Sequence, residues 1–319
     1  ALPAQRAGQP PEVTMRAAAK AAATTQPPPA PAQSAREAKR CTLAACSLGD
    51  PALPRLFVAD LVDGAGHRLS NVVNAIALAA RHGMDFGGVV RTNRGQWAID
   101  EHGHNFTRLV DEFFGSGASL QLFVHGPKTY AARFNEEKDL LQNRTLLRNS
   151  TDVYLFSATL WGYGKKFDSE SAASSPVMDY FSPAVRQALR RPTASLPLHF
   201  APRRPAVGVH VRRGDLPKSS VRVVPDEYYL GLIDAVRSVI PEADVHLWSS
   251  VGSGRAASPW AASDFDGFRA RGVAVHLDED DVVLTWVHLM RAAVFVASPS
   301  FFSYIPGVLS LNCVVYPGN

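Results

Sequence analysis

The residues with the clearest chemical potential follow a short apolar segment in the second half of the chain. Residues 207–215 read VGVHVRRGD, so the segment ends in His210, Arg212, Arg213 and Asp215. Open α/β sheets bind ligands at the carboxyl ends of their strands, where these side chains would lie. Because arginine stays charged and its planar guanidinium matches phosphate oxygens, the pair favours a diphosphate ligand. Surface arginines beside a turn-capping aspartate are the alternative interpretation.

A second candidate is a glycine-containing turn before an amphipathic segment. Residues 63–68 read DGAGHR. Gly64 and Gly66 would let the backbone approach a ligand, and the following helix N-terminus would offer N–H groups to an anion. His67 and Arg68 lie in the same turn and are further candidates for ligand binding. A tight turn without a ligand explains the same residues.

A third candidate lies near the carboxyl end, where residues 297–303 read ASPSFFS. Ser298 is the predicted N-cap of a helix, with Pro299 at the first helical position. Ser300 and Phe301 would then lie at the helix N-terminus, where N–H groups can meet a phosphate. A capped helix with no ligand is the alternative.

Together these motifs resemble the superfamily of inverting fucosyltransferases that includes the α-1,2- and α-1,6-fucosyltransferases and the protein O-fucosyltransferases. Its signature strand reads HxRRxD, which residues 210–215 match. Residues 225–229, PDEYY, repeat the proline, acidic residues and tyrosine that often follow it before a helix. The glycine turn and the Ser-Phe-Ser-like turn also correspond, so the resemblance runs unevenly over residues 55–319.

The resemblance implies a GT-B fold, with two Rossmann-like doubly wound domains facing a cleft, and metal-independent inverting transfer of a sugar. It implies GDP-fucose as the donor co-substrate, a glycan or protein hydroxyl as acceptor, and no permanently bound cofactor. Arg212, with Arg213 nearby, would contact the donor diphosphate, and Ser300 with its neighbours would close around it. A fixed guanidinium there stabilises the charge that grows on the leaving diphosphate.

The chain departs from the family pattern at acidic positions, since Ser249 and Ser250 stand where members often carry carboxylates. The catalytic base is therefore unassigned, and the carboxylates to consider are Asp63, Asp226 and Glu227. A non-catalytic nucleotide-sugar or glycan-binding protein on the same scaffold is the first alternative.

Acidic residues also follow another apolar segment, where residues 278–281 read DEDD. Asp278 and Asp280 could hold a divalent cation that clamps a nucleotide diphosphate. Acidic residues equally favour the first turn of the helix predicted next. We expect no bound metal, and a metal-dependent GT-A type transferase using Asp278 and Asp280 is the second alternative.

Apolar runs alternating with helical periodicity from residue 55 predict an α/β fold. Predicted strands are Arg55–Leu61, Leu120–Val124, Val153–Phe156, Ala206–Val211, Asp244–Trp248, Val273–Leu277, Val294–Ala297 and Cys313–Tyr316. Predicted helices are Leu69–Arg81, Ala131–Arg148, Met178–Arg190, Asp226–Ile240, Asp264–Arg271, Val282–Ala292 and Phe301–Leu309. A proline-rich loop divides an acceptor-side domain, residues 51–200, from a nucleotide-sugar-binding domain, residues 201–319.

Composition separates a tail from this folded part. The chain has 319 residues, 46% hydrophobic and 19% charged, which excludes disorder throughout. Residues 1–50, rich in alanine and proline, are predicted to be a disordered stalk. Residues 1–40 carry the whole net charge of +4, and the remainder balances 27 basic against 27 acidic groups. A basic nucleic-acid-binding surface is therefore not expected.

Three N-x-[ST] triplets, at Asn105, Asn143 and Asn149, favour a protein of the secretory pathway. No apolar run approaches the length of about 20 residues that spans a bilayer. We expect a location in the Golgi lumen, with a type II membrane anchor outside this chain.

Overall fold

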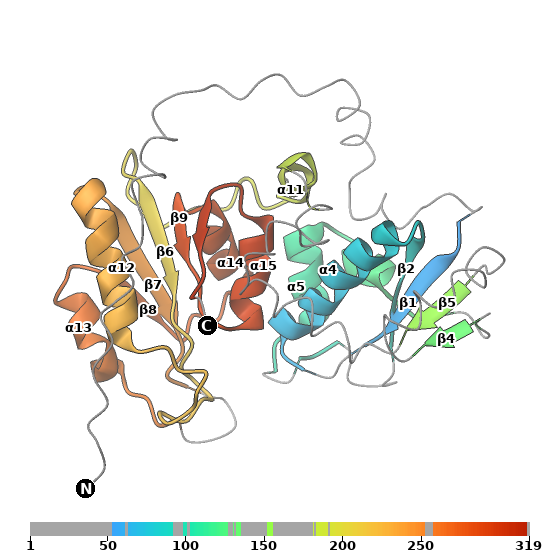
Figure 1. The fold of residues 1–319 in the computed structure, drawn as a ribbon, viewed down its shortest axis with the longest axis horizontal. Coiled ribbons are helices and arrows are strands. Elements are labelled where there is room, and N and C mark those ends of the chain that lie inside the picture. Colours follow the sequence, from blue (N-terminus) through green and yellow to red (C-terminus); the bar gives the residue numbers. More distant parts are fainter. Residues whose placement is uncertain are drawn as a thin grey trace, which may run out of the picture. The chain divides into compact units, whose positions relative to one another are not determined.

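The computed structural model describes residues 53–60, 63–91, 98–100, 103–126, 130, 132–134, 152–155, 181, 183–190, 192–252 and 258–317. All of them belong to one compact unit, Ala38–Asn319. They form two five-stranded sheets flanked by helices (Figure 1). No described helix has the length and apolar character needed to cross a membrane. The predicted stalk lies outside the described residues.

The first sheet is parallel and has the strand order β3-β2-β1-β5-β4. Its strands are β1 (Arg55–Ala59), β2 (Asp85–Val90), β3 (Phe123–Val124), β4 (Ala132–Phe134) and β5 (Asp152–Leu155). Its helices are α4 (Ala65–Arg81), α5 (Phe106–Phe114) and α6 (Ala118–Leu122), and α11 (Pro183–Leu189) follows. The chain builds outward from β1 through β2 to β3, then continues on the other side, so a topological switch point lies between β1 and β5.

The second sheet has the order β10-β9-β6-β7-β8 and is also parallel. Its strands are β6 (Ala206–His210), β7 (Asp244–Ser249), β8 (Ala274–Leu277), β9 (Val294–Val296) and β10 (Cys313–Val315). Its helices are α12 (Asp226–Val239), a short 3₁₀ turn (Ala262–Phe265) leading into α13 (Asp266–Arg269), α14 (Val282–Arg291) and α15 (Phe301–Leu309). The switch point of this sheet lies between β6 and β9.

Alternation along the strands divides the second sheet into two faces. Val209 and Leu247 belong to one apolar cluster with Ile233 of α12. Trp248, one residue after Leu247, packs instead with Leu289 of α14. Figure 1 accordingly shows α12 and α13 on one side of the sheet and α14 and α15 on the other. The predicted α/β class with two doubly wound sheets is confirmed.

The predicted elements of the second half are all found, with ends that differ by two residues at most. Four predictions for the first half differ from the structure. The helix predicted from Leu69 begins at Ala65, and the helix predicted from Met178 begins at Pro183. Residues 120–122 of the predicted strand Leu120–Val124 are helical, and residues 132–134 are a strand instead of part of the helix predicted over Ala131–Arg148. Residues 135–148 of that predicted helix lie outside the described residues.

The two sheets share one hydrophobic core where their helices meet. Phe113 of α5 lies edge-on to Trp286 of α14 at 5.2 Å between ring centroids. The buried Tyr304 hydroxyl of α15 donates to Asn74 Oδ1 of α4 at 2.6 Å. Gly66 of α4 faces the first turn of α15, where an added Cβ would stand 2.8 Å from the backbone nitrogen of Phe302. Only glycine permits this approach of the two helices.

We therefore expect Gly66→Ala to lower the free energy of unfolding by about 1–3 kcal/mol, because the Cβ collides with backbone that cannot turn aside. Gly231→Ala in α12 is the matched control, since its Cβ would meet nothing within 4 Å. That substitution should raise stability by about 0.5–1 kcal/mol through helix propensity. Urea denaturation of both variants measures the effect, and a Gly66→Ala protein as stable as Gly231→Ala would contradict the close approach.

Candidate functional site

The three motifs singled out in the sequence follow β1, β6 and β9, the strands that border the two switch points. Ligands of doubly wound sheets bind outside the carboxyl ends of strands at such points. The fold therefore brings the glycine turn, the HxRRxD segment and the serine-rich turn toward one region of the molecule. Their individual contacts decide which of them remain available to a ligand.

His210 joins the HxRRxD segment to the serine-rich turn. It ends β6, is buried, and its Nδ1 hydrogen-bonds to the hydroxyls of Ser303 at 2.6 Å and Ser298 at 2.9 Å. Burial, with the nearby Arg212 charge, lowers the pKa of His210 to about 3. The imidazole is therefore neutral at physiological pH and serves to lock the β9–α15 turn onto the end of β6.

The N-cap of α15 differs from the prediction. Ser300, not Ser298, precedes the first helical residue, and its hydroxyl accepts a hydrogen bond from the backbone N–H of Phe302 at 3.2 Å. Ser298 is fully buried and turned toward His210 instead. The prediction of Ser298 as the N-cap depended on Pro299, because proline is common at the first helical position. Phe301 is the first helical residue and is partly exposed.

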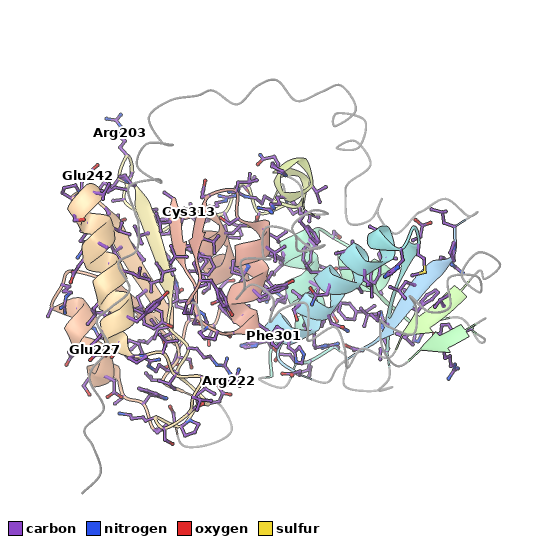
Figure 2. All side chains as sticks on the ribbon, viewed as in Figure 1. Arg203, Arg222, Glu227, Glu242, Phe301 and Cys313 are labelled. Carbon is purple, nitrogen blue, oxygen red and sulfur yellow. The ribbon has the colours of Figure 1, made fainter. Side chains whose placement is uncertain are left out.

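The glycine turn lies directly against this helix end. The rings of His67 and Phe301 stack at 4.5 Å with their planes 12° apart, and Figure 2 shows Phe301 on α15 beside the start of α4. His67 Nδ1 is paired with Asp63 Oδ2, and Asp63 Oδ1 accepts from the backbone N–H of Gly64 at 2.7 Å. The Asp63–His67 pair is thus held at the contact between α4 and α15.

The start of α4 is not an open anion cradle of the kind expected. The N–H of Ala65 donates to Asp100 Oδ2 at 3.1 Å, beside the Asp63 bond to Gly64. Arg68 is buried and donates to Asp60 from Nε at 3.2 Å and from Nη2 at 2.8 Å. Its guanidinium lies 3.7 Å from the Phe106 ring centroid. Arg68 and the first N–H groups are thus occupied by the chain's own carboxylates.

Arg213 is likewise committed to internal contacts. Its side chain is 3% exposed, is paired with Asp226, and donates to the carbonyl oxygen of Val224 at 3.0 Å. Its guanidinium lies 4.6 Å from the Trp260 ring centroid. Arg213 therefore fixes the loop between β6 and α12. Sequence reasoning missed Trp260, because nothing in a sequence links an aromatic residue to an arginine 47 positions earlier.

Arg212 faces the solvent more than Arg213 does. Its side chain is 23% exposed, and Nη2 pairs with Asp215 Oδ1 at 2.5 Å. Asp215 is itself 45% exposed, so this pair can exchange for a ligand at modest cost. Of the two guanidiniums in the motif, Arg212 is the more exposed.

The carboxylates considered as bases are scattered. Asp226 is bound to Arg213 at the first turn of α12, and Glu227 is exposed on that helix. Figure 2 places Glu227 well apart from Phe301. Asp63 is the carboxylate of the three that lies at the α4–α15 contact.

The acidic run after β8 has structural roles. Asp278 Oδ1 accepts from the Ser250 hydroxyl at 2.6 Å and from the N–H groups of Val251 and Gly252 at 2.9 Å each. Asp281 caps α14 by accepting from the N–H of Leu284 at 2.8 Å. Asp280 is exposed. These contacts account for Asp278 and Asp281 without a cation.

A surface hollow of about 560 Å³ lies along α5, and its lining includes Asn105, Arg108 and Asp111. No residue of the three motifs lines it. The candidate site accordingly rests on the motif contacts and not on this hollow.

The pKa of His210 predicts a pH dependence of stability. The unfolded chain takes up a proton near pH 6.5 that the folded protein refuses down to about pH 3, so stability falls as pH drops through this window. Between pH 7 and pH 5, the unmodified protein should lose about 2 kcal/mol more of its free energy of unfolding than His210→Asn does. Urea denaturation at both pH values measures it. The exposed His125→Asn serves as control, and equal pH slopes in the two variants would contradict the buried neutral state.

No protein-family model and no curated protein matches the sequence. Among solved structures, POFUT1 in its apo form is 11% identical with a TM-score of 0.43, and the match covers 85% of this chain and 99% of that one. POFUT1 in complex with GDP-fucose is 10% identical with a TM-score of 0.41 over the same shares. The Escherichia coli heptosyltransferase WaaC with ADP-2-deoxy-2-fluoro heptose is 12% identical with a TM-score of 0.35, covering 83% of this chain and 89% of that one.

Proposed function

We propose that the chain is a glycosyltransferase that transfers a sugar, with inversion, from a nucleoside-diphosphate donor to a hydroxyl of a glycan or protein. GDP-fucose is the donor to test first, because the HxRRxD segment resembles the fucosyltransferase signature. One observation carries the proposal: His210 of that segment is hydrogen-bonded to the turn after β9, which in turn packs on the turn after β1.

Arg212 is the proposed diphosphate ligand. Arg212 follows β6, which borders the switch point on one side. The first turn of α15 follows β9, which borders it on the other side. Helix N-termini attract phosphate through their N–H groups and dipole, and α15 is capped only by the neutral hydroxyl of Ser300 among its described contacts. When the bond between sugar and phosphate breaks, negative charge grows on the leaving diphosphate. A fixed guanidinium therefore stabilises the transition state more than the ground state.

Asp63 and His67 are the proposed base. An inverting displacement by a hydroxyl needs a group that takes its proton. Asp63 accepts from Nδ1 of His67, which sets the tautomer whose Nε2 can take a proton, as a carboxylate does for imidazole in other acid–base pairs. We prefer the Asp63–His67 pair to Asp226 and Glu227 as the base. Asp226 is bound to Arg213, and Glu227 lies well apart from Phe301 (Figure 2).

A location in the secretory pathway, with a membrane anchor outside this chain, belongs to the same proposal. Asn105, the acceptor asparagine of one N-x-[ST] triplet, is exposed at the N-cap of α5, which is compatible with glycosylation. Asn143 and Asn149 lie outside the described residues.

Arg212→Ala should reduce transfer or hydrolysis of GDP-fucose by about 10²–10³, because one charge-stabilising donor is lost from the transition state. The exposed Arg222→Ala, in the same loop, is the control and should leave turnover unchanged. Steady-state kinetics with calorimetric titration of GDP separates turnover from binding. Unchanged turnover in Arg212→Ala contradicts the phosphate role, and GDP binding without turnover over a broad acceptor panel favours the non-catalytic alternative.

Asp63→Asn and Asp226→Asn distinguish the base. Asp63→Asn should lower kcat by about 10²–10⁴ with little change in GDP affinity, since proton transfer and not donor binding is lost. Asp226→Asn should instead lower the thermal stability, because it weakens the contact that holds Arg213, while keeping most of kcat. The reverse pattern would assign the base to Asp226.

A further inference from the structure

Four histidines gather on the face of the second sheet that α14 covers. His246 lies in β7 and His276 in β8, His288 lies in α14, and His199 precedes β6. The His199 ring stacks on that of His288 at 4.4 Å between centroids and on that of His276 at 5.3 Å. None of these residues takes part in the proposed transfer.

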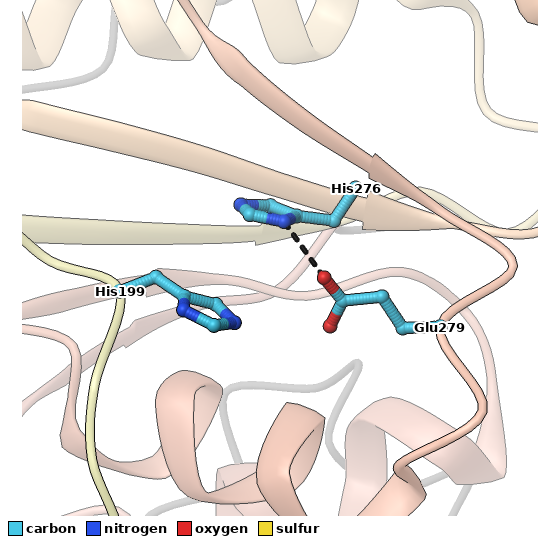
Figure 3. Close-up of side chains that lie close together, drawn as sticks. All are labelled: His199, His276 and Glu279. Carbon is cyan, nitrogen blue, oxygen red and sulfur yellow. Dashed lines mark ion pairs between the residues drawn. The ribbon is translucent and has the colours of Figure 1, made fainter.

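Two of these histidines and a neighbouring glutamate converge as metal ligands would. His199, His276 and Glu279 each offer one ligand atom, and these atoms lie within 4.8 Å of one another. Figure 3 shows the three side chains directed toward one another, with His276 Nδ1 and Glu279 Oε1 2.8 Å apart. Two imidazoles and one carboxylate are a ligand set that Zn²⁺ accepts, with a fourth position left for water.

The groups behind these ligands orient them. Trp248 Nε1 donates to Glu279 Oε2 at 3.1 Å, which directs the other carboxylate oxygen toward the histidines. His276 Nε2 lies 2.8 Å from His246 Nδ1, and His246 Nε2 lies 3.1 Å from Asp244 Oδ2. The backbone N–H of His199 donates to His288 Nε2 at 2.7 Å. In zinc sites a ligand histidine usually donates its other ring N–H to a carboxylate, a carbonyl or water. Here His246 takes that place, with Asp244 behind it.

A bound cation would balance the hydrogen atoms of this chain of contacts. Asp244, His246, His276 and Glu279 make three successive contacts, and each contact needs one hydrogen. Two neutral imidazoles supply only two. If His276 Nδ1 and Glu279 Oε1 both bind a cation, the two remaining contacts are satisfied by the two hydrogens.

We propose that His199, His276 and Glu279 form a Zn²⁺ site that ties the segment before β6 to the end of β8. The site is separate from the proposed sugar transfer, because β7 lies between β8 and the switch point at β6. Sequence reasoning predicted no metal here, since His199 stands 77 residues before His276. The spacing His276-x-x-Glu279 was the only local signal.

Equilibrium dialysis of the full untagged chain against ZnCl₂, with a competing chelator, tests the site. We expect one Zn²⁺ per chain and a rise in Tm on binding, because a ligand of the folded state stabilises it. His199→Ala removes an exposed ligand and should fold normally, and Glu279→Gln keeps the shape of its side chain. Both should weaken Zn²⁺ binding by ~100-fold or more, beyond the ~10–100-fold expected for His246→Ala behind the ligands.

The exposed His125→Ala is the control, because it removes a histidine outside the cluster. It should keep the affinity, the stoichiometry and the visible spectrum of the Co²⁺-substituted protein. Absence of stoichiometric Zn²⁺ binding overturns the proposal. So does Zn²⁺ binding that is equally strong in His199→Ala, Glu279→Gln and His125→Ala.

Discussion

The close contact between the first turns of α4 and α15 is the constraint on which the candidate site depends. Gly66 leaves no room for a side chain against the Phe301–Phe302 backbone, so the two helix ends meet at backbone distance. The turn that precedes α15 is itself bonded to His210 at the end of β6. One glycine thus aligns the segments after β1, β9 and β6, and a displacement at Gly66 would reach Arg212 two residues beyond His210.

The two helix ends in this contact differ in charge. Asp63 and Asp100 accept hydrogen bonds from the first N–H groups of α4, so its positive end is neutralised from within. Ser300 caps α15 with a hydroxyl, which carries no charge. The two helix ends therefore differ in how their positive ends are compensated, by carboxylates at α4 and by a hydroxyl at α15. The proposed roles of Asp63 as part of the base and of α15 as a phosphate neighbour rest on this difference.

Much of the second half of the chain could be predicted because its apolar runs are short, regular and bounded by polar turns. The first half was harder. β2 contains Gly87 and Gly88, which weaken a strand pattern, and α6 runs directly into the two-residue strand β3. The motif residues were found from their types, but their partners were not. Only the folded chain shows that Arg213 pairs with Asp226, Arg68 with Asp60 and Arg212 with Asp215.

The face of the second sheet toward α14 and α15 carries several side-chain rings with polar nitrogens. His210, Trp248 and His276 lie in one row across β6, β7 and β8, since His210 pairs with Trp248 and Trp248 with His276 in the strand register. Burial of an imidazole is costly unless its nitrogens find partners. Ser298 and Ser303 satisfy the His210 end of the row, and Trp248 itself donates to Glu279. The His276 end has a histidine and a carboxylate as neighbours, so a cation there would complete the row in the way the serine hydroxyls do at the other end.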